Sequence, residues 1–299
     1  MEEFYIENDD FFGDNISDIE KKQKEKEERK GKNTYKNNNN INNENKLNKR
    51  QKTRLNEKKK KEEIKLEHKN QVQNMTKEEK DIFYQKLRDE KKQLKENLKQ
   101  ALSSDFIIVF DLDFNSSMGF NEIKSLIIQL GYCYSINKKN KNKISFYLTN
   151  YDGFIKEELE KMGSKSWYSH FEKEQFYNIE KLIKLNKEFI YLTPDSNEEL
   201  NEVSTDKIYI IGGLVDKPVI KDKTLLRISQ INNLDFIKEK GIKIKSAKLP
   251  LFKYLNNIAN PILNLNTVVE ILSNYMDMDI KDWKKAIELS IPQRNLKKE

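Results

Sequence analysis

The 299-residue sequence predicts an α/β domain built on a largely parallel sheet. Its main signal is a set of short, continuous apolar runs, which suit strands that are buried on both faces. These runs alternate with segments in which apolar residues recur at helical spacing, the order expected when helices connect parallel strands. About 190 residues in this pattern can bury a substantial single core.

The predicted elements follow one another from residue 106 toward the C-terminus. Strands are expected at 106–110, 144–149, 189–193, 208–211 and 242–244. A first helix carries Ile123, Leu126, Ile127 and Leu130 on one face, and we expect it to stop at Gly131. Further helices are expected at 152–162, 196–203, 221–238, 265–276 and 279–289.

Charge is distributed unevenly ahead of this domain. Residues 1–20 carry eight acidic and no basic residues, whereas residues 21–100 carry 27 Lys and Arg against 14 Asp and Glu. Because residues 21–75 are rich in Lys, Glu, Asn and Gln, we expect 1–75 to be a disordered low-complexity arm. A basic segment beside a nearly neutral domain is a common way to attract phosphates, and a solvating tail is the plain alternative.

A basic helix is expected over 76–103, between the arm and an α/β domain at 104–295. Thr76 and Glu79 fit a capping box at its start. Apolar residues from Ile82 to Leu102 then recur on one face, and the other face is basic. Its basic residues are Lys86, Arg88, Lys91, Lys92, Lys95 and Lys99. Such a face can follow a nucleic-acid backbone or can simply be solvated.

Composition excludes several classes of protein. No run approaches the ~18 consecutive apolar residues that a membrane-spanning helix needs. A single Cys133, with only His68 and His170 beside it, allows no internal disulfide and no Cys/His zinc site, so we expect no metal. The acidic start MEEFYIENDDFF fits neither a secretory signal nor a mitochondrial presequence. These features suit the nucleus, the cytoplasm or both, and the basic run 46–61 could act as a nuclear address.

Three predicted strands end in polar or glycine residues, where ligands of parallel sheets bind. One is Asp111-Leu112-Asp113, which resembles the nucleophile motif of haloacid-dehalogenase-like phosphatases but has Asn115 where that motif expects Thr or Val. The second is Thr193-Pro194-Asp195, and the third begins with Gly212-Gly213, which either admits a ligand close to the backbone or is a tight turn. No G-x-G-x-x-G and no P-loop occurs, so dinucleotide and P-loop sites are not expected.

Several motifs occur together in a fixed order. They are Val109-Phe110-Asp111-Leu112-Asp113-Phe114, Tyr134-Ser135-Ile136-Asn137-Lys138-Lys139, Phe146-Tyr147-Leu148-Thr149, Tyr191-Leu192-Thr193-Pro194-Asp195-Ser196, Tyr209-Ile210-Ile211-Gly212-Gly213-Leu214-Val215-Asp216, Lys248-Leu249-Pro250-Leu251, Asp282-Trp283-Lys284-Lys285-Ala286 and Ile291-Pro292-Gln293-Arg294. This set resembles the Trm-ten family of tRNA N1-purine methyltransferases, which act at nucleotide 9 and form a branch of the SPOUT superfamily. The resemblance covers roughly residues 80–295.

The resemblance implies a C-terminal trefoil knot that holds S-adenosylmethionine, and a monomer. It nominates eight cofactor-binding residues: Leu192, Thr193, Gly213, Thr224, Lys248, Leu249, Leu263 and Thr267. It nominates Asp216 as the general base that removes the N1 proton of guanine. Adenine N1 carries no proton, so N1-methyladenosine is the alternative product. We expect tRNA contacts from Lys86, Arg88, Lys92, Lys95, Lys99, Asn137, Lys138, Lys139 and Arg294.

Two departures from the family pattern support a second hypothesis, a catalytically inactive RNA-binding protein of the same fold. Thr267 stands where family members usually have His, and residues 228–240 are longer than the usual connection, which affects the alignment of Thr224 and Lys248. A phosphatase that uses Asp111 is a third and weaker alternative.

Overall fold

The computed structural model describes residues 75–114, 117–215 and 222–297, together with isolated positions between 55 and 73. The chain divides into two compact units, Met1–Gln93 and Leu94–Glu299, and the second unit contains the sheet. The predicted arm lies almost entirely outside the described residues, and so does Asp216.

Helix α3 (Lys77–Gln100) begins at the predicted capping box. The Thr76 amide donates to Glu79 Oε2 at 2.7 Å, and the Glu79 amide donates to Thr76 Oγ1 at 3.2 Å. Leu98 is buried near the end of the helix, which continues into the 3₁₀ turn η1 (Ala101–Ser103). The helix predicted over 76–103 is therefore confirmed.

All strand pairs in the six-stranded sheet are parallel, and the order is β3-β2-β1-β5-β4-β6. The strands are β1 (Ile107–Asp111), β2 (Ser145–Thr149), β3 (His170–Phe171), β4 (Glu188–Leu192), β5 (Lys207–Gly212) and β6 (Ile244–Ala247). The predicted fold class and five predicted strands are confirmed, with β6 displaced toward the C-terminus. The sequence analysis missed β3, whose two residues are too few to form an apolar run.

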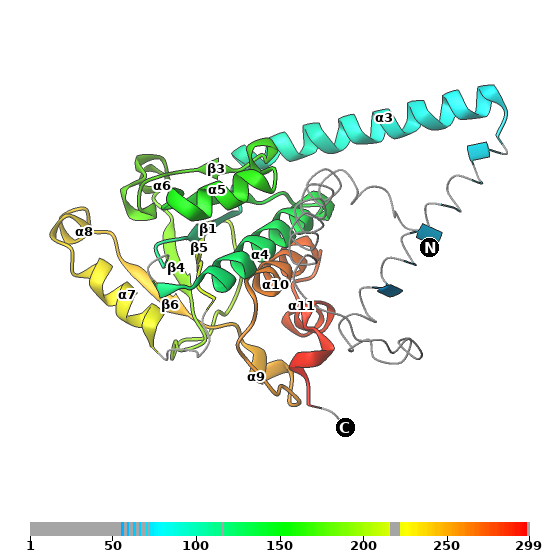
Figure 1. Ribbon diagram of the computed structural model, residues 1–299. Coiled ribbons are helices and arrows are strands. Elements are labelled where there is room, and N and C mark those ends of the chain that lie inside the picture. The colour runs from blue at the N-terminus through cyan, green and yellow to red at the C-terminus, as the bar shows by residue number, and fades with distance from the viewer. Residues whose placement is uncertain are drawn as a thin grey trace, which may run out of the picture. The chain divides into compact units, whose positions relative to one another are not determined.

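Helices cover both faces of this sheet, with α7 and α8 on one side and α4 and α10 on the other (Figure 1). The helices are α4 (Phe120–Lys139), α5 (Gly153–Lys161), α6 (Glu180–Lys184), α7 (Lys223–Asn232), α8 (Asp235–Glu239), α9 (Leu251–Tyr254), α10 (Leu265–Asp277) and α11 (Trp283–Ser290). Short 3₁₀ turns are η3 (Ser164–Ser166), η4 (Phe176–Asn178) and η5 (Gln293–Asn295). The core on the α7 side joins side chains of β1, β4 and β5 to Ile228, Ile231 and Ile237.

Three predicted helix boundaries are wrong. Helix α4 does not stop at Gly131 but continues to Lys139, because Cys133 and Tyr134 extend its buried face. The segment 196–203 is not helical, since its backbone pairs with Lys248 next to β6 instead. The helix predicted over 221–238 is interrupted near Leu234, whose extended backbone separates α7 from α8.

Two asparagines fix how a helix leads into the next strand. Asn137 near the end of α4 donates its amide to the Ile144 carbonyl and accepts from the Ile144 amide, both at 2.8 Å. Asn232 at the end of α7 makes the same pair of bonds to Ile244, at 2.9 and 3.0 Å. These paired bonds set the starts of β2 and β6, and the second joint helps to position the pocket described below.

Candidate functional site

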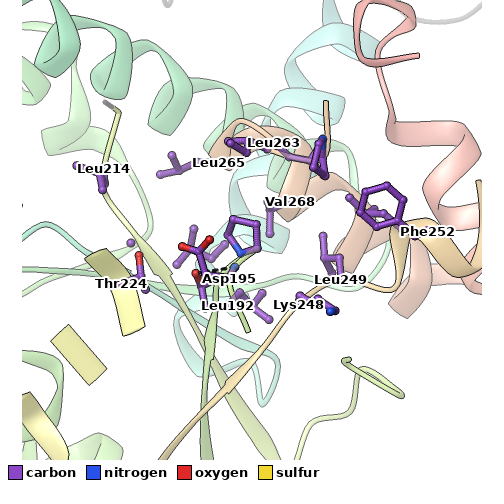
Figure 2. Close-up of a pocket in the computed structure, with 17 residues that line it drawn as sticks. Leu192, Asp195, Leu214, Thr224, Lys248, Leu249, Phe252, Leu263, Leu265 and Val268 are labelled. Carbon is purple, nitrogen blue, oxygen red and sulfur yellow. Dashed lines mark hydrogen bonds between the residues drawn. The ribbon is translucent and has the colours of Figure 1, made fainter. Parts of the chain in front are cut away.

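A pocket lies at the carboxyl ends of β4, β5 and β6, where three loops meet the start of α10 (Figure 2). The residues that line it are Leu192, Thr193, Pro194, Asp195, Ile211, Gly212, Leu214, Thr224, Lys248, Leu249, Leu251, Phe252, Pro261, Ile262, Leu263, Leu265 and Val268. Most of these side chains are apolar, and only Thr193, Asp195, Thr224 and Lys248 are polar. Such a lining suits a ligand with a flat apolar part and a few polar groups.

Backbone hydrogen bonds hold the loops of this pocket in place. The Thr193 amide donates to the Ala247 carbonyl at 2.9 Å, which extends the pairing of β4 with β6. The Lys248 amide donates to the Glu198 carbonyl, and the Lys248 carbonyl accepts from the Leu200 amide, both at 2.8 Å. The segment that the sequence analysis took for a helix therefore forms part of the support for the pocket.

The structure brings six of the eight nominated cofactor residues to this one pocket. They are Leu192, Thr193, Thr224, Lys248, Leu249 and Leu263. Thr224 and Lys248 are among them, so the longer connection at 228–240 does not displace either residue from the pocket. That connection is absorbed by α7 and α8, where Ile231 and Ile237 are buried.

The other two nominated residues, Gly213 and Thr267, are not among the residues that line the pocket. Thr267 is 2% exposed and faces the interior of the domain, while Leu265 and Val268 of the same helix line the pocket. A Cβ on Gly213 would lie 2.7 Å from Leu112 Cδ2 and 3.0 Å from the Asp111 carbonyl oxygen. Gly213 is thus needed for close packing against the end of β1, which corrects its expected role in admitting a ligand.

A buried ionic cluster occupies the neighbouring end of β1. Asp111 is 0% exposed and accepts from Arg227 Nε at 2.6 Å, from Arg227 Nη2 at 3.0 Å and from Tyr191 Oη at 3.0 Å. Asp113 accepts from Arg227 Nη1 at 2.7 Å and from Gln175 Nε2 at 3.1 Å. Burial and then the Asp111 charge raise the pKa of Tyr191. Burial alone would lower the pKa of Arg227, but bonding to Asp111 and its charge raise it overall.

This cluster removes the basis of the phosphatase alternative. Its two carboxylates are neutralised by Arg227, whereas a phosphatase of that class needs them to bind magnesium and attack phosphate. Within the described part of the chain, no three or more His, Cys, Asp or Glu side chains converge as metal ligands would. In the same residues, no helix combines the length and the apolar character needed to cross a membrane.

The nominated tRNA-binding residues differ in accessibility. Lys86, Arg88, Lys92, Lys95, Lys99, Lys139 and Arg294 are exposed. Lys138 is half-buried, with Nζ 5.3 Å from the centre of the Tyr134 ring, and burial lowers its pKa. Asn137 is a correction, because it is 0% exposed and its amide is fully engaged with Ile144. It fixes a helix–strand joint and does not present its side chain to a ligand.

A motif near the C-terminus is structural. Asp282 caps α11 by accepting from the Lys285 amide at 3.2 Å. Trp283 is buried, donates its indole N–H to the Asn201 carbonyl at 2.7 Å, and packs on Tyr275. This motif secures α11 against α10 and the loop that follows β4.

A family model described as tRNA (guanine(9)-N(1))-methyltransferase TRM10/TRM10A matches residues 15–296. The chain belongs to this family. A TRM10-family relative from Kluyveromyces lactis, named tRNA (guanine(9)-N1)-methyltransferase, is 31% identical over 202 residues, which are 68% of this chain and 62% of that protein. A protein of the same name from Schizosaccharomyces pombe is 30% identical over 210 residues, which are 70% of this chain and 64% of that protein. The chain therefore spans less than two thirds of the length of either relative.

Solved structures of TRM10 proteins share the fold. The crystal structure of full-length spTrm10 in complex with SAH has a TM-score of 0.52 and 32% identity, covering 63% of this chain and 96% of that chain. The structure of spTrm10(74) has the same TM-score, with 30% identity over 63% of this chain and 95% of that chain.

Sequence reasoning missed several residues around the TRM10 pocket. Asp195 lines it and accepts from the Asp222 amide at 3.0 Å. Its place at a polar strand end was the signal that could have found it. Arg227 gave no local signal, since its partner Asp111 lies 116 positions earlier in the sequence.

Proposed function

We propose that this chain is an S-adenosylmethionine-dependent tRNA methyltransferase that forms N1-methylguanosine at position 9. The observation that carries the proposal is the convergence of six independently nominated residues on one pocket at the carboxyl ends of β4, β5 and β6. Membership of the TRM10 family and the SAH complex of a relative support the same cofactor, since SAH is what remains of S-adenosylmethionine after methyl transfer.

The pocket residues fit this cofactor chemically. Leu192, Leu249 and Leu263 offer apolar surfaces suited to an adenine ring, and Lys248 offers a cation suited to a carboxylate. Thr193 and Asp195 can bond hydroxyl or amino groups. When bound, S-adenosylmethionine supplies a methyl group that a nucleophile can displace from a sulfonium. The protein contributes by holding the two reacting atoms in line.

A trefoil knot is part of the proposal. In such a knot the chain after one strand threads through the loop formed by another. The arrangement is supported by the three loops that follow β4, β5 and β6, which all reach one pocket although β4 lies between the other two strands. An experimental structure with bound SAH would test this threading, and a pocket formed without any passage of the chain through a loop would contradict it.

Asp216 is the proposed general base for guanine. A free aspartate has a pKa near ~3.9, so its surroundings must raise that value for it to accept the N1 proton efficiently. Adenine N1 has no proton to lose. The same pocket can therefore methylate adenine with Asp216 idle, which makes N1-methyladenosine the second candidate product.

The tRNA is proposed to bind through phosphate contacts of the exposed cations on α3 together with Lys138, Lys139 and Arg294. This binding should weaken steeply as salt concentration rises. The target base has to leave its stack to reach the pocket. We place this activity in the nucleus, the cytoplasm or both, in a protein that acts as a monomer.

The deciding experiment is a methylation assay on paired tRNA transcripts that carry guanosine or adenosine at position 9. We expect methyl transfer to N1 of guanosine, with Asp216→Asn slowing this reaction more than any transfer to adenosine. An equal effect on both would argue against a base role. The absence of transfer to either transcript by folded protein would reject the proposal in favour of the inactive RNA-binding alternative.

The inactive alternative has little support in the structure. Its two arguments were Thr267 and the long connection at 228–240, and neither is found among the residues that line the pocket. Thr267 is buried in α10, and the connection is packed on the opposite face of the sheet.

A further inference from the structure

Arg227 of α7 is tightly engaged at the carboxyl end of β1. Nε and Nη2 donate to Asp111 at 2.6 and 3.0 Å, while Nη1 donates to Asp113 at 2.7 Å. Nη2 also donates to Gln175 at 2.9 Å, and the guanidinium lies 5.4 Å from the centre of the Phe114 ring. The Arg227 side chain is 13% exposed, so these bonds form largely away from water.

Asp111 binds both flanks of the segment that contains Asp216. On the N-terminal side, the Gly213 amide donates to the Asp111 backbone carbonyl at 2.7 Å. On the C-terminal side, Arg227 grips the Asp111 carboxylate. A single residue at the end of β1 therefore anchors the chain before and after Asp216.

The same grip bears on the pocket. Thr224 lines the pocket and lies on α7, less than one helical turn before Arg227. Just ahead of α7, the Asp222 amide donates to Asp195, another pocket residue, at 3.0 Å. Any shift of α7 relative to β1 would consequently move Thr224 and the end of the Asp216 segment together.

We infer that Arg227 is a positioning residue that fixes α7 to the end of β1, and thereby holds both Thr224 and the Asp216 segment in their working places. The part concerning Asp216 rests on the proposed function, whereas the part concerning Thr224 rests only on the pocket. A small misplacement of a catalytic group can cost about 100-fold in rate, even when the altered residue is remote from the chemistry.

The geometry favours arginine over lysine at this position. The planar guanidinium reaches Asp111 through two nitrogens while a third nitrogen reaches Asp113. A lysine ammonium keeps the charge but lacks this rigid fork. Arg227→Lys therefore separates the positioning role from simple neutralisation of Asp111.

The chain offers a matched control at the opposite edge of the same sheet. Lys187 precedes β4 and pairs with Asp105, which precedes β1, at 3.2 Å. Its side chain is also 13% exposed, but it joins the amino ends of the strands, away from the pocket. Lys187→Gln removes a comparable cation without touching α7.

The test compares Arg227→Lys, Arg227→Gln and Lys187→Gln with the unaltered protein. Three quantities are measured for each: the affinity for SAH by calorimetry, the affinity for the tRNA transcript, and the single-turnover rate of guanosine methylation. For Arg227→Lys we expect a rate about 100-fold lower, with tRNA affinity within about three-fold of the unaltered value. SAH affinity should fall several-fold through Thr224, and Lys187→Gln should change none of the three.

A rate and an SAH affinity within about two-fold of the unaltered protein in folded Arg227→Lys would overturn the inference. Equal losses in Lys187→Gln would also overturn it, because they would indicate a general effect of stability. If Arg227→Gln does not fold, the comparison of Arg227→Lys with Lys187→Gln decides alone. If the unaltered protein binds SAH but methylates no transcript, the proposed function fails, and the SAH affinities still test the link to Thr224.

Discussion

Two halves of one sheet edge differ sharply in this protein. At the carboxyl ends of β4, β5 and β6 the loops leave a pocket with mainly apolar walls. At the carboxyl ends of β1 and β2 the space is filled by the Asp111–Arg227 ion pair and its neighbours. The half with the conspicuous carboxylates is the closed one, so acidic residues at a strand end do not by themselves indicate an active site.

The largest expected effect breaks the closed half. Asp111→Ala leaves Arg227 buried without its main partner, which should lower the free energy of unfolding by about 3 to 5 kcal/mol. Replacing both partners, as in Asp111→Leu with Arg227→Met, should cost less because no unpaired charge remains. Urea denaturation measures both. Asp105→Ala is the control, since Asp105 is 80% exposed and its pair should contribute about 1 kcal/mol or less.

The second prediction compares one leucine from each half. Leu112 is 0% exposed behind β1, and truncation to Ala should cost about 2 to 5 kcal/mol. Leu263 lines the pocket and is only half-buried, so Leu263→Ala should cost clearly less than Leu112→Ala. Leu263→Ala should, however, reduce the rise in melting temperature that SAH produces. Equal losses of stability at both sites would contradict the distinction between a filled half and an open half.

The third prediction concerns the glycine between the two halves. Because a Cβ on Gly213 would lie 2.7 Å from Leu112, Gly213→Ala should lower the free energy of unfolding by about 1 to 3 kcal/mol. The control is Gly119→Ala, where the nearest listed neighbour of the added Cβ would be 3.7 Å away and the backbone φ of −78° is ordinary. Thermal unfolding of both variants checks this, and a neutral Gly213→Ala would show that the close packing is not required.

The smallest effect is a pH dependence in the closed half. His170 of β3 stacks on Tyr147 and its Nε2 lies 2.9 Å from the Leu102 carbonyl. Burial lowers the pKa of His170, and Lys181 acts in the same direction against that hydrogen bond. The unfolded chain therefore takes up a proton near pH ~6.5 while the folded protein resists it, so stability falls as the pH drops through this value.

His170→Gln should make this decline shallower, because glutamine does not titrate. The measurement is the melting temperature of both proteins between pH 7.5 and 5.5 at constant ionic strength. Parallel curves for the two proteins would contradict a contribution from His170.

The fold was largely predictable because its strands are locally encoded. Runs such as 106–110 and 208–211 are apolar throughout, and only a strand buried on both faces uses such a run at that length. The Thr76–Glu79 capping box was equally local. Segment 196–203 was not predictable in this way, because its backbone partner is Lys248, some fifty residues further along the chain.

The pocket was predictable only through resemblance. Leu249 and Leu263 have no local property that separates a ligand wall from a core position. Asn137 was misread because its polar side chain is satisfied by Ile144, a partner that composition cannot reveal. Arg227 was missed for the same reason, since its pairing with Asp111 exists only in the folded domain.

The most direct test of this account is a calorimetric titration of the full chain with SAH, run in parallel on Leu249→Arg. The account predicts a saturable one-to-one heat for the unaltered protein. It also predicts affinity at least about 30-fold weaker in the folded variant, because an unpaired charge would have to enter the apolar wall. Absence of binding by the folded unaltered protein, or equal affinity in both, would contradict the claim that this pocket holds the methyl donor.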